Sequence, residues 1–148
     1  MALQLTTNAL TPFCTNEMVS LHTSLKTSIG SIVTCPGCTI ADLKKTTFTC
    51  PNNVCHHWFA GIKAQSATQQ FCWKNSTVSM WPVHPWQIAQ CHMGLGRDAA
   101  NTNSRKTDTE GMVQLIMNCM PFHSLIDIDK VKEVITRFVI QCFFVVKV

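Results

Sequence analysis

Four cysteines in the first half of the chain have the type and spacing of metal ligands. Cys35 and Cys38 flank a Pro-Gly pair, and eleven residues later Cys50 and Cys55 flank four further residues. Tetrahedral zinc takes four soft ligands, which short turns supply in pairs. The second pair is wider than the usual CxxC. We expect a structural zinc site formed by Cys35, Cys38, Cys50 and Cys55.

Two histidines, His56 and His57, directly follow the fourth cysteine and are reserve ligands for this site. Because four protein ligands would fill the zinc coordination sphere, such a metal would fold a loop and would not activate water. The alternative is that these thiols are buried or unpaired, since cysteine is among the most buried residue types.

The remaining chemistry-bearing residues form no recognisable catalytic set. Cys72, Cys91 and Cys119 lie in or beside apolar segments and are expected in the core. No spacing joins a Cys-His or a Ser-His-Asp combination. The sequence leaves a catalytic role open but favours a non-catalytic one.

Three tryptophans, Trp73, Trp81 and Trp86, could stack on single-stranded bases. They lack interleaved basic residues, however, so we expect them to pack in the core. The net charge of +4 is spread without a block of like charge, so RNA binding is only weakly indicated.

Composition indicates an intracellular protein, cytoplasmic or nuclear. The nine cysteines cannot all pair with one another, and the first residues lack the features of a secretory signal. Free thiols or metal ligands are therefore favoured over disulfides, and the sequon at Asn75 is read as chance. No segment approaches the length needed to cross a membrane. Only 14% of residues are charged, which is low and suggests a protein partner, a second copy or missing chain.

The cysteines must be positioned by helices, because the apolar residues recur at three- and four-residue spacing. Thr15 to Ile29 is predicted to form a helix that Thr15 or Asn16 caps and Gly30 ends, with an apolar stripe of Met18, Val19, His22, Leu25 and Ile29. His22 is expected at the core or its boundary. A second helix is expected to begin near Asn53, with Val54, Trp58 and Ile62 on one face.

The second half predicts three more helices. Pro85 suits the first turn of one, which Gly94 and Gly96 would end. Thr107 to Glu110 matches a capping box before a helix that extends through Met120. Asp127 or Asp129 is expected to cap the last helix. The run from Phe143 to Val148 could be a strand.

Several of these segments resemble a vertebrate family named after open reading frame 38 of the X chromosome, which has no assigned activity. The resemblance is carried by Trp73-Lys74-Asn75, by Met80-Trp81-Pro82-Val83, and by Trp86-Gln87-Ile88-Ala89 with Met93. Stretches 13–25, 115–119 and 129–135 agree, so the similarity runs from about residue 3 to residue 137. The family has further residues before the first match and a long acidic helical tail after the last.

The resemblance implies a fold similar to HEPN domains, which are helical bundles. Some HEPN proteins cut RNA with an Arg-x4-His motif on the last helix, and others only bind or dimerise. The arginine at the matching position is Arg137, but Cys142 stands where the histidine would be. A thiol, with an unperturbed pKa near 8.5 against about 6.5 for imidazole, is a poor substitute near neutral pH. The resemblance therefore implies a degenerate site, with Arg137 as the RNA-contacting residue of that alternative.

Together these observations predict a mainly α, incomplete HEPN-like bundle. Residues 1–148 are expected to be a single partial domain, with a Cys-rich insertion at 34–57 and a divergent hydrophobic tail at 138–148 that indicates a truncated or alternatively spliced member. The predicted function is an intracellular binding or oligomerisation module with structural zinc, and the alternative is a HEPN-type RNA-binding or ribonuclease domain.

Overall fold

The computed structural model describes residues 2–30 and 33–145, and within these it leaves out the side chains of residues 2–7, 52 and 137–145. The described part is mainly helical, as the apolar periodicity predicts, and its only strand-like feature is one isolated antiparallel bridge between Ser66 and Cys119. The helices are α1 (Ala2–Ile29), α2 (Ile40–Leu43), α3 (Val54–Ala64), α4 (Pro85–Cys91), α5 (Thr109–Asn118), α6 (Met120–His123) and α7 (Ile128–Val145).

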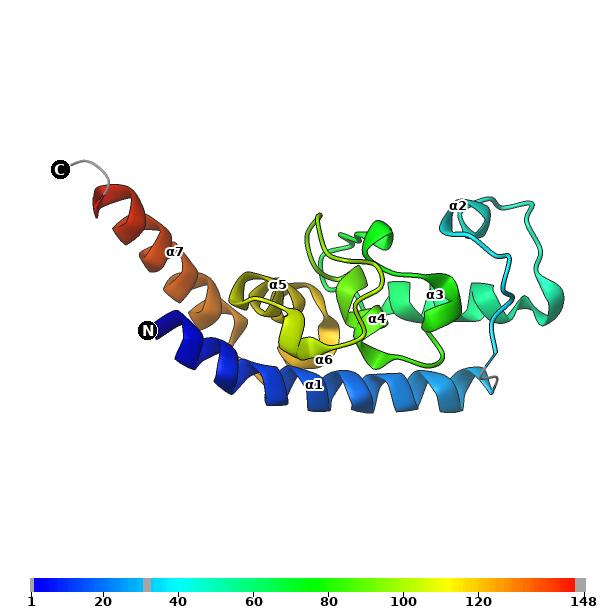
Figure 1. Cartoon of the computed structure of the whole chain (residues 1–148), viewed down its shortest axis with the longest axis horizontal. Helices are drawn as coiled ribbons and strands as arrows, with labels where there is room; N and C mark the ends of the chain where they lie inside the picture. The colour runs from blue at the N-terminus through cyan, green and yellow to red at the C-terminus, as the bar shows by residue number, and fades with distance from the viewer. Residues whose placement is uncertain (1, 31–32, 146–148) are drawn as a thin grey trace.

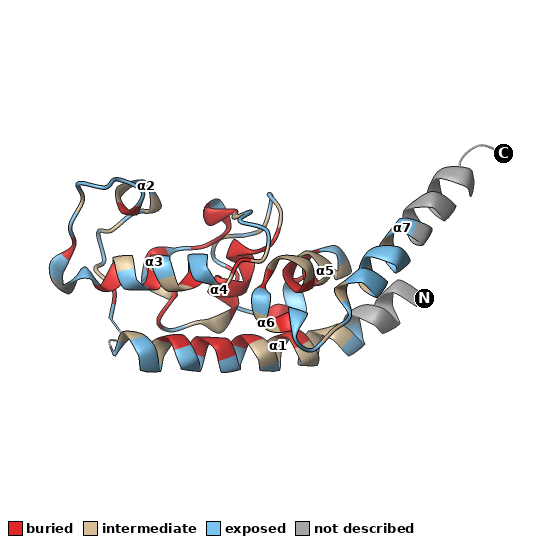
Figure 2. Ribbon diagram, turned by 180° about the vertical axis from the view of Figure 1, so that it is seen from behind, coloured by how far each residue is buried: buried red, intermediate tan, exposed pale blue. Residues whose placement is uncertain are grey.

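The long helix α1 forms one side of the molecule, and α3, α4 and α5 lie along it (Figure 1). Its inward face holds Cys14, Met18, Leu21, His22 and Leu25, which recur at helical spacing and are buried (Figure 2). His22 lies in the core as expected, where its Nε2 is 2.8 Å from the carbonyl oxygen of Trp81.

Two predictions about α1 are wrong. The helix begins at Ala2 and continues through Pro12, so neither Thr15 nor Asn16 caps it. The Thr15 hydroxyl instead donates to the carbonyl of Thr11 at 2.6 Å and lies 2.8 Å from Ser104. Val19, assigned to the apolar stripe, is 46% exposed because it lies just beside the buried face. Gly30 does follow the end of the helix, with a φ of 69° that favours glycine.

Helix α3 confirms its predicted face, since Val54, Trp58 and Ile62 are all buried. Gly61 allows α3 to approach α1 closely, because a Cβ there would lie 3.0 Å from the Leu25 side chain. The contact between these two helices fixes α3, whose first turn carries Cys55, against the core.

The elements of the second half depart from prediction at their ends. Pro85 opens α4 as expected, but that helix ends at Cys91, before either predicted glycine. Asp108, not Thr107, caps α5 by accepting from the Gly111 N–H at 2.8 Å, so the predicted capping box between Thr107 and Glu110 does not form.

Helix α5 stops at Asn118 because the chain there pairs with residues 65–67. The Ala67 N–H donates to Asn118 and the Met120 N–H donates to Gln65, each at 2.8 Å. Of the two predicted caps, Asp127 is the one that accepts a helix N–H, from Lys130 at 3.2 Å. The backbone of 143–145 is helical, so the strand prediction is wrong for these residues, and 146–148 lie outside the described ones.

Helix α7 runs away from the rest of the molecule (Figures 1 and 2). At the opposite end, residues 33–53 form an arm that carries α2 and returns to the start of α3. Within the described residues, no helix combines the length and hydrophobicity that crossing a membrane requires.

Candidate metal centre

The first pair of predicted ligands lies on a tight turn at the base of the arm. The Cys38 N–H donates to the Cys35 carbonyl at 3.3 Å, which closes the turn around Pro36 and Gly37. Thr34, the residue before Cys35, anchors the turn to the rest of the molecule. Its buried hydroxyl donates to the Val78 carbonyl at 3.3 Å. Both cysteines are half-buried, so one edge of the pair faces solvent.

The second pair brackets the start of α3. Cys50 precedes a single 3-10 turn, Pro51–Asn53, and Cys55 lies in the first turn of α3. The link between the two is Asn53, whose left-handed φ of 52° suits asparagine better than most residues. Both Cys50 and Cys55 are buried, at 5% and 0% exposure.

These two turns bring the four sulfurs together. The Sγ atoms of Cys35, Cys38, Cys50 and Cys55 all lie within 4.8 Å of one another. A zinc tetrathiolate with bonds of about 2.3 Å has sulfur–sulfur edges of about 3.8 Å. The cluster needs only a small contraction to reach this geometry, so the four cysteines can hold a single metal ion.

Backbone N–H groups at the start of α3 favour a thiolate at Cys50. Burial alone would raise the pKa of this thiol, but the amide N–H groups of Cys55 and His56 outweigh it and lower the pKa. The Cys35 N–H lies 3.2 Å from the Cys55 sulfur as a further donor. Burial nevertheless raises the pKa of both Cys55 and Cys38, and the neighbouring thiol of Cys35 adds to the rise.

The two reserve ligands do not join the cluster that can hold a metal. The His56 Nε2 lies 2.8 Å from the carbonyl of Phe48, and the two rings are in contact at 5.8 Å. His56 therefore ties the loop before Cys50 to α3. His57 is exposed.

The other predicted cysteines lie in the core, as expected. Cys72, Cys91 and Cys119 are buried, and so is Cys14, which the sequence analysis did not single out. Burial raises the pKa of Cys14, Cys91 and Cys119 to about 12, so these thiols are protonated at neutral pH. The spacing of Cys14 from Met18 and Leu21 was the signal that could have placed it on the buried face of α1.

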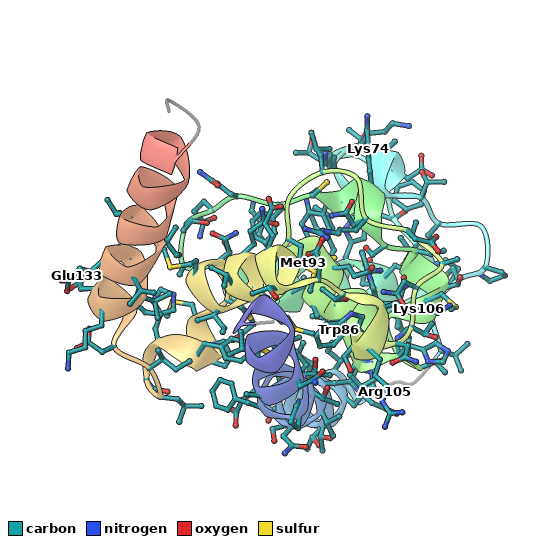
Figure 3. All side chains as sticks on the ribbon, turned by 60° about the vertical axis from the view of Figure 1, so that its left-hand side comes forward. Lys74, Trp86, Met93, Arg105, Lys106 and Glu133 are labelled. Carbon is teal, nitrogen blue, oxygen red and sulfur yellow. The ribbon has the colours of Figure 1, made fainter. Side chains whose placement is uncertain are left out.

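The tryptophans are core residues, which confirms the packing prediction. Trp81 and Trp86 are buried, and their indole N–H groups donate to Ser76 and Thr107. The ring of Trp73 stacks on Phe59 at 4.5 Å and on Phe71 at 4.9 Å. Figure 3 shows Trp86 and Met93 in the interior, whereas Lys74, Arg105 and Lys106 point outward.

The motif segments contain a network of buried amides that the sequence analysis missed. The Asn75 side chain donates to the carbonyls of Gln90, Met93 and Gly94, and Gln90 donates back to Asn75. Gln87 joins it by donating to residues 99 and 101. Asn75 is 2% exposed, which agrees with the sequon being a chance match.

Arg137, the residue of the alternative RNA site, belongs to α7. The side chains of Arg137 and Cys142 are not among those that the structure describes.

Comparison with known proteins identifies the family. Residues 1–139 match a family described as "Domain of unknown function (DUF4559)". A mouse (Mus musculus) protein named "Uncharacterized protein CXorf38 homolog" is 28% identical over 133 residues, which cover 86% of this chain and 41% of the relative. The chain thus spans about two-fifths of that relative's length. No solved structure matches the chain. Since the matched region covers most of its length, the chain belongs to the DUF4559 family.

Proposed function

We propose that this chain is a non-catalytic helical module whose Cys-rich arm is folded by a structural zinc ion. The observation that carries the proposal is the approach of four sulfurs to within 4.8 Å. Thiolate ligands favour zinc or iron over magnesium or calcium. With all four positions filled by protein, zinc would have no open position for substrate or water.

The surroundings of the cluster support this proposal. Four thiolates around a divalent ion leave two excess negative charges, which N–H donors and the positive end of a helix stabilise. The amides of Cys35, Cys55 and His56 donate to sulfur, and two of these lie in the first turn of α3. The metal would then fasten the arm to a helix that is packed against α1.

Metal analysis of single-cysteine variants tests the proposal. The chain, expressed with zinc and iron both supplied, is expected to purify with about one zinc ion per chain. Cys50→Ser should lose most of it, because one of the four ligands is removed and the N–H groups that face its sulfur lose their thiolate acceptor. Cys72→Ser is the matched control, since Cys72 is also buried but lies outside the cluster. Equal zinc in both variants, or no metal in the parent, would contradict the proposal.

The same module is proposed to bind another protein, with a second copy of this chain as the first candidate. Support comes from Met120, Leu125 and Val134, which are 50%, 55% and 52% exposed and lie in the stretch of chain from α6 to α7. Exposed apolar side chains are typical of contact surfaces when they form one patch.

Oligomeric state tests this part of the proposal. Val134→Glu should shift a concentration-dependent dimer towards monomer in sedimentation velocity. Thr136→Glu places the same charge on an exposed position of the same helix and should have less effect. A monomer at all concentrations would exclude self-association and leave a different protein as the partner.

The finer predictions from the resemblance stay predictions. The helical content agrees with a bundle, but the HEPN-like topology, the partial domain with its insertion and tail, and the intracellular location have no direct support. Neither does the RNA-binding or ribonuclease alternative. Replacing Arg137 by Ala and assaying RNA cleavage tests that alternative, and unchanged background activity would reject it.

A further inference from the structure

The four cysteines of the cluster differ in their access to solvent. Cys35 and Cys38 are half-buried and flank Pro36 and Gly37, which are exposed. Cys50 and Cys55 are buried beneath them. A small reactant that approaches from solvent therefore meets the first pair before the second.

The half-buried pair, Cys35 and Cys38, also has a backbone that suits a disulfide. The hydrogen bond from the Cys38 N–H to the Cys35 carbonyl closes a four-residue turn. Such turns bring their end Cα atoms within about 7 Å, and disulfides span Cα distances of about 4.4 to 6.8 Å. The two sulfurs already lie within 4.8 Å of each other. Forming the bond requires side-chain rotation and little movement of the chain.

The core cysteines do not compete for an oxidant. Cys14, Cys91 and Cys119 are fully buried, and the thiolate is the form that reacts. Cys72 is buried as well, with 8% exposure.

We propose that Cys35 and Cys38 are an oxidative modification site through which a peroxide releases the metal. This inference rests on the proposed zinc site. One thiolate sulfur attacks a peroxide oxygen, the O–O bond breaks, and a sulfenic acid and hydroxide form. The second thiolate then displaces hydroxide from the sulfenic sulfur. In total, two thiolates lose two electrons to form one disulfide, while hydrogen peroxide is reduced to two hydroxide ions.

Loss of the metal follows because only Cys50 and Cys55 remain as ligands, and two thiolates hold zinc far less well than four. The arm is then no longer fastened to α3 through the metal. A reducing thiol breaks the disulfide by exchange, regenerates both ligands and allows zinc to rebind. Oxidation would in this way switch the arm between a fastened and a released state.

The test treats the zinc-loaded chain with hydrogen peroxide in a Cys142→Ser background, which removes the one cysteine whose side chain lies outside the described residues. A chromogenic chelator follows zinc release, and peptide mass spectrometry maps the disulfide. The expected result is one Cys35–Cys38 disulfide for each zinc released, with full recovery after dithiothreitol and added zinc. A disulfide that maps to Cys50 and Cys55, or zinc release with only irreversibly oxidised sulfur, would overturn the proposal.

Two double variants separate this inference from the zinc proposal. Both Cys35→Ser/Cys38→Ser and Cys50→Ser/Cys55→Ser should lose zinc, but only the second should still form the 35–38 disulfide. If the parent binds no zinc, the zinc proposal fails, and disulfide mapping of that metal-free chain still decides whether this pair is the site. If zinc binds but peroxide leaves both zinc and thiols unchanged, this inference alone fails.

Discussion

His92 is expected to make the stability of the fold depend on pH. It lies just after α4 with 1% exposure, and neither ring nitrogen has a hydrogen-bond partner within the described structure. Its ring contacts Phe71 at 5.7 Å. Burial lowers the pKa of His92 from 6.5 to about 4, because the charged imidazolium would be desolvated with nothing to compensate it.

The direction of the effect follows from proton binding. Between pH 6.5 and about 4, the unfolded chain binds a proton at this residue that the folded chain does not. Stability is therefore full above the unfolded pKa and falls as the pH is lowered. At about 1.36 kcal/mol per pH unit, the whole interval corresponds to about 3.4 kcal/mol. Between pH 7 and pH 4.5 the expected loss is about 2.4 kcal/mol.

Urea unfolding of the parent and of His92→Phe at pH 7 and pH 4.5 measures this loss. Phenylalanine keeps the ring contact with Phe71 and removes both unpaired nitrogens, so at pH 7 it should be neutral or stabilising. Comparing the two proteins at each pH cancels the acid sensitivity of the cysteine cluster, which both retain. If the two proteins lose equal stability between pH 7 and pH 4.5, the assignment of His92 as a buried neutral residue is refuted.

Three further predictions concern the arm and two helix ends. Removing metal with a chelator should lower the melting temperature and increase hydrogen exchange in residues 34–57 while leaving exchange in α1 unchanged. A uniform loss of protection along the chain would contradict a role of the metal that is confined to the arm. Asp108→Ala should cost about 1 kcal/mol in urea unfolding, since it removes the α5 cap, and no change would exclude that cap. Gly30→Ala should cost about 1 kcal/mol because of its positive φ, whereas Gly37→Ala, with similar open space but no positive φ, should cost less.

The helices and the cluster were predictable where the signal is local. Val54, Trp58 and Ile62 share a face because of three- and four-residue spacing, and the structure buries all three. The cysteine pairs could be proposed as one site because each is local and only eleven residues separate them. The difference in exposure between the pairs depends on how the arm folds over α3, which spacing does not encode.

Predictions failed where a polar side chain had two uses. Thr15 has the type of a helix cap, but its hydroxyl bonds to Thr11 and Ser104 from inside α1. A different failure came from long-range backbone pairing. Helix α5 stops early because the backbone at its end pairs with residues 65–67, far away in sequence.

Residues in the segments that carry the family resemblance serve the fold, and this role also could not be predicted from local sequence. The side-chain amides of Asn75, Gln87 and Gln90 each donate to a carbonyl of the loop after α4, and Asn75 and Gln90 also bond to each other, so these buried amides hold that loop in place. A buried amide has no local sequence signature, because the sequence alone predicts glutamine and asparagine to be exposed. The tryptophans of the same motif are buried beside these amides.

Cobalt substitution tests the central claim most directly. The metal-free chain is titrated with Co²⁺, and the visible absorption of the bound ion reports its coordination. Four thiolates from Cys35, Cys38, Cys50 and Cys55 predict strong tetrahedral d–d bands and sulfur-to-metal charge transfer that saturate at about one ion per chain and vanish when zinc is added. A weak octahedral spectrum, or one that Cys50→Ser leaves unchanged, would contradict the claim that these cysteines form one metal centre.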